Sequence, residues 1–209
     1  MSSHKRQKRV SKAPEIRREE LLRVASTLFL EKGVSATAIG DIADRANVAR
    51  GTFYLYFPSK DDLVAELWKR YVMGYLTLTD AILERPTRDA PSSEQILELI
   101  VRLTEHALDH AHLHRQIYGT ADAPALALCR RSDAMILARL TDVIQAYFKR
   151  LKRPTNSAEL TASLLFHGLD GALHNAIMKE TSINRAAFVN GVREFSIHVL
   201  AIDARFLAP

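Results

Sequence analysis

The chain has a single cysteine, Cys129, among its 209 residues. One cysteine cannot form an internal disulfide, so we expect a protein of a reducing compartment, the cytoplasm. No apolar run approaches the length that crosses a bilayer, and we expect no membrane partner. The first dozen residues are basic, but no uninterrupted apolar segment follows them, and we expect no secretory signal.

Signatures of catalysis are also missing. The sequence contains no Gly-rich phosphate loop, no nucleophile motif and no zinc-protease helix. We therefore expect no enzyme and no cofactor. A helical enzyme or small-molecule-binding protein whose N-terminal domain is vestigial stays as an alternative.

Positive charge is unevenly distributed along the chain. Residues 1–70 hold 14 Lys and Arg against 9 Asp and Glu, whereas residues 71–209 hold 15 of each. The stretch "HKRQKRVSK" alone carries five cations and no anion. This asymmetry favours a polyanionic partner for the N-terminal part. The alternative is a disordered tail that only keeps the protein soluble.

Apolar residues recur with helical spacing almost throughout, and no stretch of alternating polarity is long enough for a strand. We predict an all-α protein, with a flexible basic tail, a three-helix helix-turn-helix domain, and a larger antiparallel helical domain for effector binding and dimerisation. The three parts span residues 1–13, 14–60 and 61–209. Helices are expected from Pro14 to Gly33, from a Thr37 cap to Ala46, within 47–57, after a Ser59 cap, and at about 93–112, 124–151, 157–180 and 184–207.

Residues 37–57 are best explained as two helices joined by a tight turn. Ile42, Ala43 and Ala46 give the first helix a small apolar face that a second helix can cross closely. Asn47 suits the turn, because asparagine tolerates positive φ better than other non-glycine residues. Phe53 is expected to face inward, together with Phe57 four residues on. The side chains left facing outward are Arg50, Thr52, Tyr54 and Tyr56.

A helix-turn-helix places the start of its second helix in the major groove of DNA. Arg50 is suited to the edge of a guanine, and Thr52, Tyr54 and Tyr56 are suited to phosphate oxygens. Lys60, at the positive end of the next helix, is suited to another phosphate. We therefore predict a protein that binds double-stranded DNA.

The string "TAIGDIADRANVARGTFYLYFPSKDDLV", preceded by an amphipathic helix ending in "FLEKG", resembles the DNA-binding domain of the TetR family of transcriptional regulators. The resemblance covers about residues 14–65; the rest of the chain agrees only in length and helical character. It implies a helical homodimer that binds a palindromic operator, usually as a repressor. A small-molecule effector in the C-terminal domain would release it from the DNA.

The resemblance also implies roles for individual residues. Base-reading positions correspond to Arg50 and Gly51, and positions that commonly contact the DNA backbone correspond to Thr37, Thr52, Tyr54, Tyr56 and Lys60. Gly40 stands where the family often has a longer polar residue that reaches DNA. Ala49 stands where a serine cap is frequent, at a cost of roughly 1 kcal/mol of helix stability. We infer that Arg50, Arg45 and the basic tail contribute more of the binding than usual.

Each of the last two expected helices has an apolar stripe, which predicts that it packs against another helix. We predict a four-helix interface, with two helices from each subunit of a homodimer, as the resemblance also implies. The alternative is that both stripes are intramolecular core. The predicted interface residues are Leu165, Gly168, Leu169, Ala172, Ala176, Phe188, Val192, Phe195, Val199 and Ile202.

An effector site between the helices is expected to be mostly apolar, with a few polar groups. The candidate lining residues are Trp68, Tyr71, Tyr75, His106, Tyr118, Met135, Phe166, His167, His174 and Asn175. For each alone, a core or surface role is more common than a ligand contact, and the chemistry of the effector does not follow from these residues.

Two further alternatives concern regulation and specificity. His106 and His110 are one turn apart in "HALDHAHLH", a spacing that suits a metal ion, and Cys129 next to two arginines could sense redox state. A metal- or redox-responsive regulator is therefore one alternative. Histidines that are exposed or partly fill the ligand cavity, together with a buried cysteine, explain the same residues. A non-specific or architectural DNA-binding protein that relies on the basic tail is the other.

Overall fold

The structure is a computed structural model that describes residues 13–83, 90–179 and 183–201. All regular elements in these ranges are helical, as predicted. They are α1 (Pro14–Lys32), α2 (Ile39–Arg45), α3 (Arg50–Tyr54), α4 (Lys60–Leu83), α5 (Ser93–Asp109), α6 (Ala111–Thr120), α7 (Ala123–Arg150), the short 3-10 helix η1 (Thr155–Ser157), α8 (Ala158–Met178) and α9 (Arg185–Leu200). None of the helices in these ranges is both long and apolar enough to cross a membrane.

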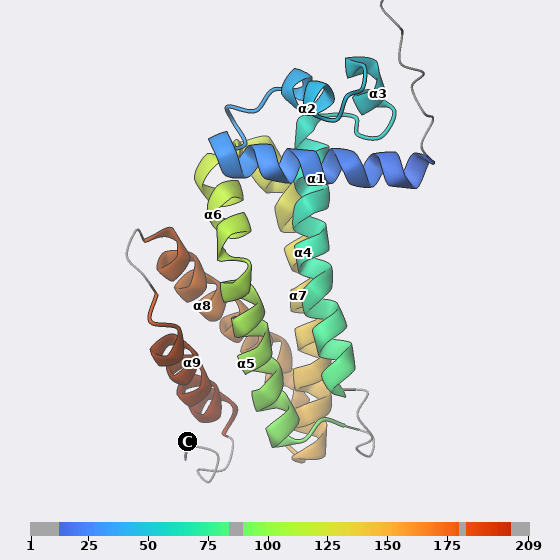
Figure 1. The fold of residues 1–209 in the computed structure, drawn as a ribbon. Coiled ribbons are helices and arrows are strands. Elements are labelled where there is room, and N and C mark those ends of the chain that lie inside the picture. Colours follow the sequence, from blue (N-terminus) through green and yellow to red (C-terminus); the bar gives the residue numbers. More distant parts are fainter. Residues whose placement is uncertain (1–12, 84–89, 180–182, 202–209) are drawn as a thin grey trace, which may run out of the picture.

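The helices form a small layer set across the end of a bundle of longer helices. α1 lies across the upper end of α4, and α2 and α3 lie above α1 (Figure 1). Below this layer α4 packs along α7, α5 packs against α4 and α9, and α8 packs against α7. The α1–α3 layer therefore rests on one end of the larger domain.

The buried residues form two clusters, and α4 contributes to both. The first cluster joins α1, α2 and α3 to the first half of α4 through fully buried side chains such as Leu21, Phe53 and Leu63, and it continues to Ile117 of α6 and to α7. The second joins the end of α4 to α5, α7, α8 and α9. The boundary predicted at residue 60 stays a prediction, since the first cluster continues across it.

Two of the predicted helices end earlier in the structure than expected. The helix expected at 184–207 ends at Leu200, because Ala201 is left-handed with a φ of 52°. The helix expected at 93–112 ends at Asp109, because His110 leaves helical geometry with φ −104° and ψ 17°, and a separate α6 follows to Thr120. No proline or glycine marks this break, so the sequence pattern runs through it. The cap expected at Thr37 is wrong as well: Ala38 occupies the N-cap of α2, and its amide donates to the Asp41 carboxylate (2.8 Å).

The loop after α1 is held by the end of α6. The Thr120 hydroxyl accepts a hydrogen bond from the Val34 amide (2.9 Å), and the Ser35 hydroxyl donates to the Thr120 carbonyl. Gly33 has a φ of +85°, and a Cβ there would come within 3.2 Å of the Thr120 methyl group. Residues 33–35 therefore fit against α6, and α6 links the upper layer to the larger domain.

We expect Thr120→Val to lower the free energy of unfolding by about 1–2 kcal/mol, because it leaves the Val34 amide without its acceptor. Thr77→Val is the matched control. The Thr77 hydroxyl donates to the Met73 carbonyl one turn back, just as the Thr120 hydroxyl donates to the Gln116 carbonyl, but Thr77 accepts no hydrogen bond from a loop amide among the described residues. Urea unfolding of both variants measures the difference. Equal destabilisation by the two substitutions would contradict the role of Thr120 in holding the loop.

Candidate functional site

α2 and α3 are joined by the tight turn that the sequence predicts. Asn47 has a φ of +53°, and the next amide, of Val48, donates to the Ala43 carbonyl (2.9 Å). Phe53 and Phe57 are 0% and 2% exposed, which confirms that these two rings face inward. The aromatic pair thus fixes the short α3 on α1 and α4.

Helix α3 begins without a side-chain cap. Ala49 occupies the N-cap and forms no side-chain hydrogen bond, as expected from its side chain, so the start of α3 depends on the packing of its phenylalanines. A Cβ added at Gly40 would meet open space. At Gly40 the outer surface of α2 therefore lacks the projecting side chain that a longer residue would place there.

The other side chains of α3 and of the residues just after it face outward to different degrees. Arg50, Gly51 and Tyr54 are exposed, Tyr54 by 48%, whereas Thr52 and Tyr56 are half-buried. Arg50 makes no hydrogen bond or ion pair to any described residue. Its guanidinium is available to an outside partner, although contact of these residues with DNA stays a prediction.

Three predicted DNA contacts already have partners within the protein. Thr37 is buried, and its hydroxyl donates to the Gly33 carbonyl (2.7 Å). The Lys60 ammonium donates to the carbonyls of Val34 (2.9 Å) and Thr37 (3.2 Å). Arg45 forms an ion pair with Glu31, which raises the pKa of Arg45. Each group would have to share or exchange these partners to reach a phosphate, and their roles at DNA stay predictions.

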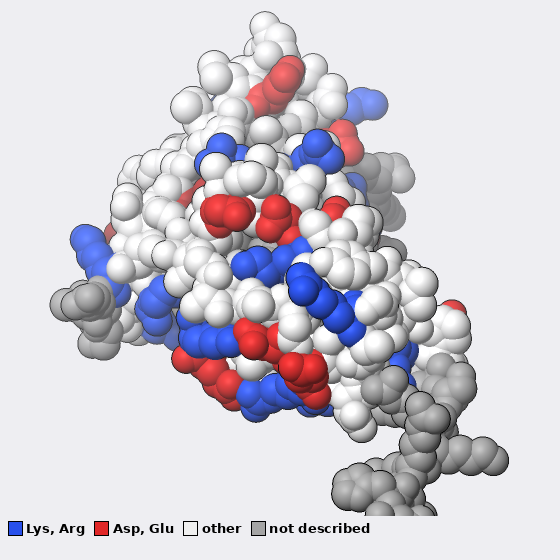
Figure 2. All heavy atoms as spheres, turned by 90° about the horizontal axis from the view of Figure 1, so that it is seen from above, with Lys and Arg blue, Asp and Glu red and all other residues white. Residues whose placement is uncertain are grey.

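Cations and anions alternate on the face that α3 belongs to. Figure 2 shows Lys and Arg interspersed with Asp and Glu on this end of the molecule. The ion pairs include Lys32–Asp41 on the loop side and Arg18–Glu66 and Arg70–Glu19 between α1 and α4. Residues 13–70 contain nine cations and nine anions, so the entire excess positive charge of the first 70 residues lies in residues 1–12.

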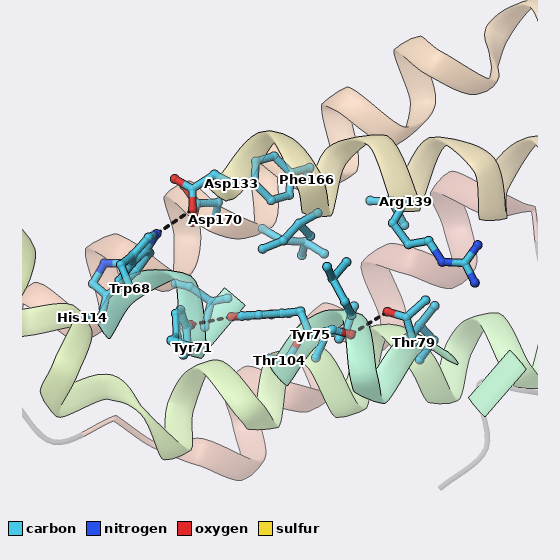
Figure 3. A pocket seen from close by; sticks show the side chains of 17 residues that line it. Trp68, Tyr71, Tyr75, Thr79, Thr104, His114, Asp133, Arg139, Phe166 and Asp170 are labelled. Carbon is cyan, nitrogen blue, oxygen red and sulfur yellow. Dashed lines mark hydrogen bonds between the residues drawn. The ribbon is translucent and has the colours of Figure 1, made fainter. Parts of the chain in front are cut away.

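A second candidate site is an apolar cavity inside the larger domain, which we call the inner cavity. It has a volume of about 80 Å³ and lies between α4, α5, α7 and α8 (Figure 3). Its lining is mainly aliphatic and aromatic: Trp68, Tyr71, Tyr75, Leu76, Thr79, Leu99, Leu103, Thr104, His114, Asp133, Ile136, Arg139, Leu140, Phe166, Leu169, Asp170 and Leu173. Sites for drug-sized ligands usually have several hundred Å³, so such a ligand would have to separate these helices.

Polar groups in the inner cavity are held in fixed positions. The indole of Trp68 donates to the Asp133 carboxylate (2.8 Å), and the hydroxyls of Tyr71 and Tyr75 hydrogen-bond to each other. Burial raises the pKa of both tyrosines above the ordinary value. Burial also raises the pKa of Asp133, and hydrogen bonding from Trp68 opposes that shift.

The inner cavity adjoins a wider hollow of about 650 Å³, which we call the outer pocket. Both are lined by Asp133, Phe166 and Asp170, which therefore lie at the boundary between them. The other residues of the outer pocket are Tyr118, Arg130, Ala134, Leu137, His167, Gly171, His174 and Asn175.

The structure brings most of the predicted effector residues to these two spaces. Trp68, Tyr71, Tyr75 and Phe166 line the inner cavity, and Tyr118, Phe166, His167, His174 and Asn175 line the outer pocket. His106 and Met135 line neither. His106 stacks on Tyr71 at 5.2 Å between ring centroids, and Met135 is 40% exposed.

Four ionisable residues that line the inner cavity were not among the predicted effector residues: His114, Asp133, Arg139 and Asp170. His114 lies on α6, the helix that the sequence pattern did not predict. Single charged residues on amphipathic helices are usually solvated, so the sequence carried no signal for the other three. His114 hydrogen-bonds to His174 (3.0 Å), and burial lowers its pKa to about 4.

The residues proposed for metal or redox sensing have other surroundings. The ring nitrogens of His106 and His110 bond to the carbonyls of Tyr71 and His106, and the described ranges hold no group of three or more metal-binding side chains. Cys129 is fully buried, and burial raises the pKa of its thiol to about 12. The thiol is therefore protonated at neutral pH, which disfavours a redox sensor.

The predicted dimer residues are divided between core and surface. Leu165 and Val192 are buried in the second cluster. Gly168, Ala172 and Phe195 are exposed, whereas Leu169, Ala176, Phe188 and Val199 are half-buried, and Ile202 lies outside the described residues. A groove of about 490 Å³ between α8 and α9 is lined by Gly168, Leu169, Ala172, Ala187, Phe188, Gly191, Val192 and Phe195.

Comparison with known proteins relates the N-terminal part of the chain to one family. Residues 21–67 match the family of bacterial regulatory proteins described as the tetR family. The transcriptional repressor KstR2 of Mycolicibacterium smegmatis is 33% identical over 105 residues, which are 50% of this chain and 49% of that protein. The chain thus matches about half the length of this relative.

Solved structures extend the likeness in fold to nearly the whole chain. The fatty acid degradation regulator FadR of Bacillus halodurans superposes with a TM-score of 0.70 at 20% identity, covering 92% of this chain and 97% of FadR. SmeT in complex with triclosan superposes with a TM-score of 0.69 at 18% identity, covering 88% of this chain and 90% of SmeT. At these identities the likeness shows the arrangement of the helices.

Proposed function

We propose that this chain, whose N-terminal domain belongs to the TetR family of bacterial regulatory proteins, is a cytoplasmic transcriptional repressor that binds a palindromic operator as a homodimer. A small molecule bound inside its larger domain releases it from the DNA. The relatives in sequence include repressors, which supports the direction of regulation.

The observation that carries the proposal is the division of α3 into two sides. Phe53 and Phe57 fix the helix from below, and Arg50, Gly51 and Tyr54 face away from the protein. A helix held in this way can enter the major groove, with Arg50 on a guanine edge and hydroxyl groups on phosphates. Five residues of helix read few base pairs, so specificity requires a second copy on the same operator.

The surface of α8 supplies a place for the second copy. Leu160, Leu164, Gly168 and Ala172 follow one another at intervals of four residues, so they lie on one face, and the two leucines are 63% and 62% exposed. Phe195 of α9, 46% exposed, lines the groove that Gly168 and Ala172 also line. Exposed apolar residues in a row are typical of a helical interface, and small residues allow its helices to approach closely.

The inner cavity supports the proposed release. A ligand that fills it has to separate helices around α4, because the cavity without ligand is small. α4 continues into the α1–α3 layer, so its tilt would change the spacing of the two α3 helices in the dimer. That spacing has to match successive major grooves, roughly 34–36 Å apart, and a ligand would therefore favour a dimer that no longer fits the operator.

We expect footprinting with excess random competitor to reveal a protected palindrome in the DNA that flanks the gene of this protein. Arg50→Ala should weaken this specific binding at least tenfold, because the guanidinium has no partner among the residues that the structure describes. Arg131→Ala, which removes an exposed arginine of α7, should leave the binding unchanged. The proposal would be contradicted if a folded dimer bound no genomic fragment with higher affinity than random duplex DNA.

The same assay distinguishes the proposed repressor from a non-specific or architectural DNA-binding protein. Deleting residues 1–12 should keep the footprint but reduce the dependence of affinity on salt, since this segment contains five cations. If the protein is a non-specific binder that relies on its tail, the deletion should abolish binding instead.

We expect Leu164→Glu to convert the dimer into a monomer, because it places two carboxylates in an apolar interface between copies of α8. Leu30→Glu is the control, since Leu30 is 54% exposed on α1, away from α8. Sedimentation velocity measures both variants, and circular dichroism checks that they are folded. A Leu164→Glu dimer as tight as the unmodified protein would exclude this interface.

A further inference from the structure

Negative and positive charges do not cancel among the side chains that line the inner cavity. Arg139 is held by Asp80 through two hydrogen bonds of 2.8 and 3.2 Å to one carboxylate oxygen. His114 is neutral at pH 7, because burial lowers its pKa to about 4. The carboxylates of Asp133 and Asp170 remain, and neither forms an ion pair within the described part of the chain. The cavity therefore carries an excess of negative charge.

The two carboxylates lie together at one end of the inner cavity, away from Arg139 (Figure 3). Asp133 comes from α7 and Asp170 from α8, and both line the boundary with the outer pocket. Asp133 is half-buried, whereas Asp170 is exposed toward the outer pocket and has no hydrogen bond to a described residue. Desolvation by the surrounding protein raises the pKa of both groups, including Asp170 although its side chain is exposed, and the charge of Asp170 raises the pKa of Asp133 further.

Aromatic rings surround the same end of the cavity. The Trp68 ring lies 4.7 Å from Tyr71 and 5.3 Å from Tyr118, measured between centroids, and its indole nitrogen is fixed by Asp133. Ring faces attract organic cations and are poor partners for anions. Beyond this end, the lining is aliphatic, which suits an apolar chain or ring.

Basic side chains in the outer pocket act against this negative charge. Arg130 attracts Asp133, and His174 and His167 attract Asp170. For both carboxyl groups the effect of burial is larger, since the pKa is raised in spite of these neighbours. None of the three forms an ion pair with either carboxylate, so a cationic ligand does not have to displace one.

We propose that the effector is an apolar organic cation, whose ammonium group sits between Asp133 and Asp170 while its apolar body enters the inner cavity. This inference rests on the effector site of the proposed function and specifies its chemistry. The ammonium group would gain the attraction of two partly desolvated carboxylates and of the Trp68 and Tyr118 rings. An anionic ligand would meet carboxylates at the end of the inner cavity that adjoins the outer pocket.

The test compares two probes with one alkyl chain and opposite head groups, decyltrimethylammonium and decanesulfonate, both below their micelle concentrations. Trp68 is the single tryptophan of the protein and lines the inner cavity, so its fluorescence reports on this site. We expect saturable binding of the cation with an affinity at least tenfold higher than that of the anion. Equal affinities, tighter binding of the anion, or no binding of either probe would overturn the inference.

Two variants assign the preference to the carboxylates. Asp170→Asn should weaken binding of the cation at least fivefold and leave or improve that of the anion; Asp133→Asn should do the same while its amide oxygen still accepts the Trp68 hydrogen bond. Asp142→Asn is the control, because Asp142 is exposed on α7 and lines neither space. Thermal unfolding checks that each variant is folded. Unchanged discrimination in both carboxylate variants would overturn the assignment.

Operator binding without any probe keeps this inference separate from the proposed function. Specific DNA binding together with equal binding of both probes would leave the repressor and overturn the cationic effector. If the protein bound the cation but recognised no operator, the cation site would stand and the proposed repressor function would be overturned.

Discussion

Helix α4 has to satisfy two buried cores at once, and the arrangement of the molecule depends on this constraint. Its first half packs Leu63 and Val64 against α1 and α3, and its end packs Ile82 against α5 and α7. Trp68 and Tyr71 lie between, where they line the inner cavity. An unbroken helix of 24 residues is about 36 Å long, so a small tilt at the cavity becomes a larger displacement at α3.

The loop between α1 and α2 gives the two domains a second connection. Lys60, the first residue of α4, donates to two carbonyls of this loop. Thr120, the last residue of α6, accepts from the Val34 amide of the same loop. α6 also places His114 at the inner cavity, on the same helix as Thr120. A change in the cavity can therefore reach the α1–α3 layer through α4 and α6 together, and α3 would respond as part of a layer fixed at both points.

The sequence was informative where local chemistry decides the structure. Asn47 at positive φ and the inward-facing Phe53 and Phe57 follow from turn chemistry and helical spacing, and both are confirmed. The break at His110 did not follow, because it depends on packing between α5 and α6 and has no proline or glycine to mark it. Asp133 and Asp170 were missed for a similar reason: whether a carboxylate on a helix faces water or a cavity depends on which helix covers it.

The claim that α4 and α6 together join the effector site to α3 is tested most directly by the distance between the two α3 helices of a dimer. Leu55, at the end of α3, is 80% exposed, and the native Cys129 is buried, so a Leu55→Cys variant can carry one spin label per subunit. Pulsed dipolar spectroscopy then compares the label separation with and without decyltrimethylammonium. The account predicts a shifted distribution once the cation is bound. An unchanged distribution at saturating cation, with Trp68 fluorescence showing that the site is occupied, would contradict it.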